Sequence, residues 1–104
     1  MAYVEKEYKK CASYVGKLFV DHGATRGVDA WGSDVPDGKV TSFPMAVKLK
    51  EGETVAFGWI EWPDKATRDK GMEAAMSDER MSMEHMPFDG QRMIFSGFEI
   101  FSDL

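Results

Sequence analysis

The sequence predicts a single α+β domain. Three observations predict it: an apolar stripe at helical spacing near the N-terminus, alternating apolar residues in later segments, and a second helical segment with its own N-cap. The predicted order is helix, strand, connector, strand, helix, strand. With one more strand in front, this order becomes βαββαβ, the ferredoxin-like unit, in which two helices cover one face of an antiparallel sheet. A chain of 104 residues is long enough for one such domain and its core.

The first predicted element is an amphipathic helix over about residues 4–22. Its apolar stripe has spacings of four and three residues: Val4, Tyr8, Cys11, Val15 and Leu18. His22 and Gly23 end the helix, because histidine suits the negative end of the helix dipole and glycine adopts the left-handed cap. Only residues 2–4 could supply the leading strand of a ferredoxin-like sheet, so that strand is expected to be missing or very short.

The middle of the chain is predicted to contain a strand and a turn, followed by a segment that could be a strand or a helix. Residues 24–31 are typical of a strand, and the Pro- and Gly-containing turn at 34–38 ends it. In residues 42–49 apolar side chains alternate as in a strand. Ser42 can nevertheless cap a helix, and Pro44 is tolerated in a first helical turn. The helical alternative is preferred, since it fits the ferredoxin-like order better.

The second half predicts two strands and a helix. Residues 53–62 alternate strongly and form the clearest strand. Asp64 then caps a helix over about 65–77, and a long loop follows at 78–90. The last segment, 91–101, is predicted to be a strand. It is apolar on both faces, which indicates a strand covered on both sides.

The composition limits which kinds of partner the protein is expected to bind and in which cellular compartment it is expected to lie. Lys and Arg number 13 against 18 Asp and Glu, a net charge of −5, and an acidic chain repels phosphate backbones. No nucleic-acid-binding motif is present, so no nucleic-acid partner is expected. No apolar run could span a bilayer, and the N-terminus lacks a secretory signal. Together with the single Cys11, these features predict a cytoplasmic protein with no membrane partner.

Several chemistries are disfavoured. Cys11 lies on the apolar stripe of the first helix, where an inert, buried thiol is expected. The sequence has no Gly-x-Ser-x-Gly elbow and no phosphate-binding glycine loop. Four potential metal ligands lie in one region, but their spacing matches no metal site: Asp78, Glu84, His85 and Asp89. Neither a metal nor a cofactor is therefore expected.

Two Pro- and Gly-containing turns, 31–39 and 86–93, carry the strongest candidates for a site, because each combines charges with large apolar residues. His85 and Asp34 are the candidate catalytic residues, as base and orienter. The candidate ligand-binding residues are Trp31, Lys39, Arg68, Asp89 and Arg92. Structural alternatives are favoured: an exposed loop histidine, turn-forming aspartates, arginines in salt bridges and a tryptophan anchor.

Four stretches of the chain carry a resemblance to a known family: WGSDVPDGK at 31–39, ETVAFGWIEWP at 53–63, MSDERM at 76–81 and MPFDGQRMI at 86–94. From about Tyr8 onward the chain resembles the YbaA-like family of small bacterial proteins, for which no reaction is established. The resemblance implies a ferredoxin-like domain paired as in the dimeric α/β-barrel superfamily. Family members begin with a strand and a Pro-containing turn, and this sequence departs from them there.

Two functions follow as alternatives. The preferred one is a homodimeric binding or interaction module without catalysis, which the apolar strand faces favour. Six of the eight methionines lie between Met72 and Met93, and they are expected to pack a core or a subunit contact. The other is a cofactor-independent small-molecule enzyme, monooxygenase- or isomerase-like, by analogy of fold. A small-molecule ligand would then bind in an apolar cleft, with Arg92 or Arg68 as an anion clamp.

Overall fold

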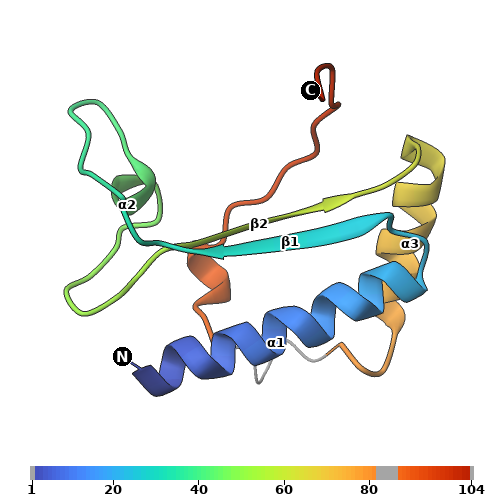
Figure 1. Cartoon of the computed structure of the whole chain (residues 1–104), viewed down its shortest axis with the longest axis horizontal. Coiled ribbons are helices and arrows are strands. Elements are labelled where there is room, and N and C mark those ends of the chain that lie inside the picture. Colours follow the sequence, from blue (N-terminus) through green and yellow to red (C-terminus); the bar gives the residue numbers. More distant parts are fainter. Residues whose placement is uncertain (1, 82–86, 104) are drawn as a thin grey trace.

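The structure, a computed structural model, describes residues 2–81 and 87–103, with side chains from Glu5 onward. It is an α+β arrangement in which a two-stranded antiparallel sheet lies beside two long helices (Figure 1). The elements, in order, are α1 (Ala2–Asp21), β1 (Arg26–Trp31), α2 (Phe43–Ala46), β2 (Ala56–Glu61), α3 (Lys65–Ser77) and the 3-10 turn η2 (Gly90–Arg92). None of the helices in these ranges has both the length and the apolar character needed to cross a membrane.

Helix α1 confirms the predicted first element and its C-terminal end. Leu18, on the predicted stripe, is 1% exposed, and its neighbour Phe19 is also buried. Gly23 has φ of +108°, in the region that glycine adopts without strain. Its backbone N–H donates to the Val20 carbonyl at 3.1 Å, which satisfies a group at the helix end.

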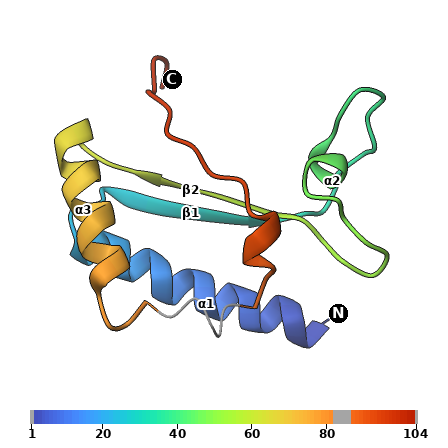
Figure 2. The same cartoon turned by 180° about the vertical axis from the view of Figure 1, so that it is seen from behind.

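The two strands pair from Arg26 opposite Glu61 to Trp31 opposite Ala56. Because side chains alternate along a strand, this register divides the sheet into two faces. One face meets α1: a Cβ at Gly27 would lie 3.8 Å from the Cα of Gly16. The other carries Val28, Ala30, Phe57 and Trp59 and is referred to below as the open face. In Figures 1 and 2, α1 runs along one side of the sheet only.

The core lies where α1, α3 and the end of β2 meet. Its buried members are Leu18, Phe19, Ala24 and Ala75, with Val15, Ile60, Trp62, Met72 and Met81 packed around them. The rings of Phe19 and Trp62 meet edge to face at 6.2 Å between centroids. Gly71 allows α3 to approach this site closely, since a side chain there would collide with the Trp62 ring.

The ambiguous segment is a short helix, as preferred. Ser42 has an extended backbone and its hydroxyl accepts a hydrogen bond from the Met45 N–H at 3.2 Å, while Pro44 lies in the first turn. The predicted strand at 53–62 and the predicted helix at 65–77 are also confirmed. β2 lies within the predicted strand, and α3 spans the predicted residues, with the Asp64 carboxylate accepting from the Thr67 N–H at 2.7 Å.

The predicted last strand, 91–101, is wrong. Gly90–Arg92 form η2, and from Met93 to Asp103 the described chain has no regular secondary structure. Its apolar side chains are not covered: Phe95, Phe98 and Phe101 are 80%, 86% and 98% exposed. An apolar segment forms a strand only when a neighbouring strand offers backbone partners. In a ferredoxin-like sheet that neighbour is the leading strand, whereas here the first described element is α1.

Candidate functional site

The structure brings the two distinctive turns together across one side chain of α1. The Tyr8 ring packs on Trp31 at the end of β1, with 5.5 Å between centroids, and on Phe88 of the second turn at 6.1 Å. Trp31 therefore acts here as a packing anchor. The three aromatic rings come from segments far apart in the sequence, so this contact fixes where both turns lie relative to α1 and β1.

Arg92 is at the centre of a polar cluster. Its Nη1 and Nη2 donate to the two carboxylate oxygens of Glu53 at 2.8 and 2.7 Å, and its Nε donates to Asp89 at 2.8 Å. Nη1 also donates to the Lys48 carbonyl at 3.0 Å. The Arg92 hydrogen bonds lower the pKa of Glu53 to about 2. Of the predicted ligand-binding residues, Asp89 and Arg92 are thus in direct contact.

The other predicted residues lie apart from this cluster. Asp34 and Lys39 are exposed on the loop between β1 and α2. Arg68 lies on α3, where its Nε is 3.6 Å from Asp69 and its guanidinium passes the backbone of Gly97. His85 lies outside the described residues. Within the ranges that the structure describes, no hydrogen bond or ion pair joins Asp34, Lys39 or Arg68 to Arg92.

A groove between α1 and β1 was not predicted from the sequence. It is open on one side, encloses about 680 Å³, and is lined by Tyr8, Lys9, Ala12, Ser13, Gly16, Lys17, Val20, Gly27, Asp29 and Trp31. Its floor comes from alternate residues of β1, and its wall from one stripe of α1. Asp29 is the residue that could have revealed it, because an acidic side chain lies on the face of β1 that meets α1, where an apolar residue is expected.

Asp29 and Tyr8, which line this groove, and Cys11 on α1 have shifted pKa values. Partial burial raises the pKa of Asp29 above its ordinary range. Burial, and secondly the charge of Asp29, raise the pKa of Tyr8 and of the half-buried Cys11. A thiol with a raised pKa carries less thiolate at neutral pH and is a weaker nucleophile. These shifts support the prediction that Cys11 is not reactive.

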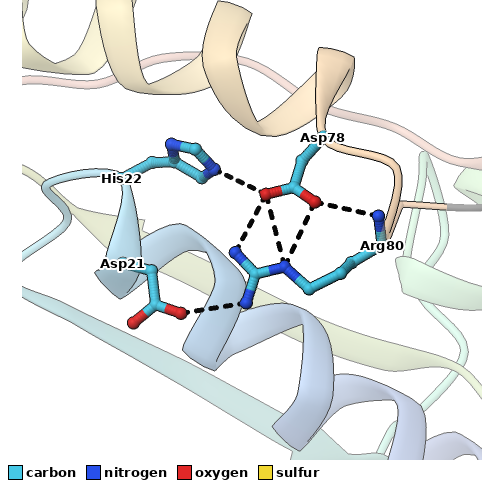
Figure 3. A network of polar contacts seen from close by, with 4 residues as sticks. All are labelled: Asp21, His22, Asp78 and Arg80. Carbon is cyan, nitrogen blue, oxygen red and sulfur yellow. Dashed lines mark hydrogen bonds and ion pairs between the residues drawn. The ribbon is translucent and has the colours of Figure 1, made fainter.

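A second polar network joins the end of α1 to the end of α3 (Figure 3). The Arg80 guanidinium donates hydrogen bonds to the Asp78 carboxylate from Nε and Nη2. Its Nη1 donates to the Asp21 carboxylate at 3.0 Å. His22 Nε2 lies 2.9 Å from Asp78 as well, so His22 bonds across to α3 besides standing at the end of its own helix. The bonds from Arg80, and then from His22, lower the pKa of Asp78.

These residues form structural networks and an open groove, with no grouping of metal ligands. Among residues 2–81 and 87–103, no three His, Cys, Asp or Glu side chains converge so as to hold a metal ion. The described polar side chains at the groove are few: Tyr8, Lys9, Ser13, Lys17 and Asp29. Such a set can offer hydrogen bonds and positive charge to a partner.

The fold and these sites define a small α+β protein with a partly uncovered sheet. Comparison with known proteins then gives the family. Residues 2–90 match the family described as "Protein of unknown function (DUF1428)", and the chain belongs to it. The chain is 53% identical over 98 residues to "Uncharacterized protein YbaA" of Escherichia coli (strain K12), covering 92% of this chain and 84% of the relative. The same values hold for the YbaA proteins of Escherichia coli O157:H7 and Shigella flexneri. The resemblance to the YbaA-like family is thereby confirmed.

Proposed function

We propose that the protein is a homodimeric interaction module of the cytoplasm, and that the open face of its sheet is the contact between the two copies. The exposure of aromatic residues on that face carries the proposal. Phe57 and Trp59, on β2, are 52% and 43% exposed, and their rings lie 5.8 Å apart. Phe43 of α2 extends this surface: its ring lies 6.0 Å from that of Phe57, and it is 59% exposed. Adjoining aromatic side chains of this size mark an interaction site.

The proposal includes a ferredoxin-like fold and an assembly of the dimeric α/β-barrel type. Support comes from the order α1, β1, β2, α3, with an antiparallel strand pair, α1 packed on β1 and α3 packed against α1. Apart from the short α2 between the strands, this is the order expected for a ferredoxin-like unit from its first to its second helix. Two such sheets placed face to face would bury both open faces, and a stable dimer needs about 1,600 Å² of buried surface.

The geometry favours this function over a small-molecule enzyme. The enzyme hypothesis uses Arg92 or Arg68 as an anion clamp. Most donors of Arg92 are directed at Glu53, Asp89 and a backbone carbonyl. Arg68 lies on α3 with its Nε 3.6 Å from Asp69. Asp34, the proposed orienter, lies exposed on a loop. An interaction module requires none of these residues to be available.

Sedimentation equilibrium of the full chain at micromolar concentration tests the proposal, and a dimer is expected. Phe57→Asp should weaken it about a hundredfold or more, because a buried unpaired carboxylate costs several kcal/mol. Tyr14→Asp is the matched control. Tyr14 is as exposed as Phe57, at 53%, but lies on α1, so this variant should remain dimeric. A monomeric wild-type protein, or equal effects of the two variants, would contradict the proposal.

A further inference from the structure

The outer edge of β1 is free to accept another strand. The Gly32 N–H donates to the Val55 carbonyl at 2.9 Å, which continues the register of the sheet. Since backbone groups alternate in direction along an antiparallel strand, even-numbered residues of β1 face β2. Gly27, Asp29 and Trp31 therefore direct their N–H and C=O groups away from β2. No backbone hydrogen bond to these groups occurs in the part of the chain that the structure describes.

These same three residues line the groove, and a stripe of α1 forms its other wall. Lys9, Ser13 and Lys17 follow one another at intervals of four along that wall, so they lie in a row parallel to the strand. A free strand edge beside a helix is the geometry by which domains bind an extended peptide: the edge supplies backbone hydrogen bonds, and the helix supplies side-chain contacts.

The C-terminal segment, residues 94–103, has the properties of a strand that lacks a neighbour. Apolar side chains recur along it and are exposed, including Ile94 at 65% and Ile100 at 66%. It also carries two acidic residues, Glu99 and Asp103, and no basic ones. The groove is lined by Lys9, Lys17 and one acid, Asp29. Lys9 pairs with Glu5 on its own helix at 2.8 Å, whereas Lys17 forms no ion pair among the described residues. The two lysines give the helical wall of the groove a positive charge opposite in sign to that of the segment.

The segment is directed away from the groove of its own chain. In Figures 1 and 2 it leaves η2 and extends on the side of the sheet opposite α1, and the C-terminus lies far from that helix. The groove lies between α1 and β1. A second copy can offer its segment without any rearrangement of the sheet, whereas the chain's own segment would first have to cross to the other side.

We propose that the groove between α1 and β1 binds residues 94–103 of a second copy, which add to the free edge of β1 as a third strand. Reciprocal exchange would then place two such segments in each dimer. The inference rests on the proposed homodimer and adds a second, specific contact to it. It also gives a role to the exposed apolar side chains of residues 94–101.

A photo-crosslinking experiment tests the exchange. Benzophenone-alanine replaces Phe98 in isotopically labelled chain, which is mixed with unlabelled wild-type protein, refolded together, irradiated and analysed by mass spectrometry. Crosslinks from position 98 to residues 9–31 of the other isotope are expected. Crosslinks only to Phe57 or Trp59, or only within one chain, would overturn the exchange while leaving the dimer intact. A sedimentation result of monomer would overturn both proposals.

Two sets of variants test the exchange of the segment in a second way. Asp29→Pro removes an outward-facing N–H from the edge of β1, so the intermolecular crosslink should be lost. Asp29→Ala keeps that N–H and should retain the crosslink; circular dichroism checks that both variants fold.

Charge reversal at Lys9 and Lys17 to Glu should lower the crosslink yield about fivefold, as expected for two exposed ion pairs. Adding Glu99→Lys and Asp103→Lys should restore it. If the fourfold variant is no better than the double one, the proposed charge match is refuted.

Discussion

Arg92 holds Glu53 with both of its terminal nitrogens, Nη1 on Oε1 at 2.8 Å and Nη2 on Oε2 at 2.7 Å. The pair joins the turn after Phe88 to the loop before β2. The Arg92 side chain is 23% exposed and that of Glu53 34%. Fork geometry of this kind is specific to arginine and a carboxylate.

Arg92→Lys should therefore lower the melting temperature although it preserves the charge, since lysine cannot form the paired hydrogen bonds. Glu53→Gln should have a similar effect. Differential scanning calorimetry measures both. Glu51→Gln, two residues away on the same loop and exposed, is the control and should leave the melting temperature unchanged. Equal effects at positions 51 and 53 would show that the pair has no special role.

Stability should fall in acid. The pKa of Glu53 is lowered from its ordinary value of 4.5 to about 2, and that of Asp78 is lowered as well. A carboxyl whose pKa is lowered by folding stabilises the folded state above its unfolded pKa, and this contribution is lost as the pH falls through the folded pKa. Urea unfolding should show a decline in stability between pH 4.5 and about 2. Asp78→Asn should flatten that decline, and an unchanged slope would contradict the assignment.

The charge of Asp29 should affect the pKa of the Cys11 thiol. Burial raises the pKa of Cys11 most, and the negative charge of Asp29 raises it further. Asp29→Asn removes that charge, so the Cys11 pKa should fall and alkylation by iodoacetamide at pH 8 should become faster. The variant should also be more stable at neutral pH, because the raised pKa of Asp29 means that folding disfavours its charged form. Faster alkylation with lower stability would instead indicate local opening.

Two glycines should respond to alanine in opposite ways. A Cβ at Gly71 would overlap the Trp62 ring and lie 2.7 Å from the His22 carbonyl oxygen, so Gly71→Ala should cost about 1–3 kcal/mol through overpacking. Gly16, on the other helix, has nothing within 4 Å of a Cβ. Gly16→Ala should stabilise α1 by about 0.5–1 kcal/mol. Chemical denaturation measures both, and a neutral Gly71→Ala would imply that α3 can shift outward.

Elements with local signals could be predicted from the sequence. α1 and α3 follow from apolar spacing and from their ends, where Gly23 and Asp64 act as foreseen. Ser42 likewise decided the ambiguous segment, because its hydroxyl caps α2. These features depend on residues within one helical turn of each other, so the sequence alone contains the information.

Non-local features could not be predicted. The segment 91–101 has the composition of a buried strand, but pairing depends on a neighbour that only the whole fold supplies. The groove depends on how α1 crosses β1, and its key residue Asp29 carries no recognisable motif. Arg92 was identified as a candidate, yet the bonds it makes to Glu53 depend on a loop far away in sequence.

The Tyr8 ring packs against both Trp31 and Phe88, so the two turns that carry these residues should open together. If the turn at 31–39 separates from α1, Tyr8 loses one of its two ring contacts, and it loses the other if Phe88 moves away. Amide protons on the two turns should consequently exchange with deuterium as one cooperative unit. A change at either turn should therefore affect the other, although Trp31 and Phe88 lie 57 positions apart in the sequence.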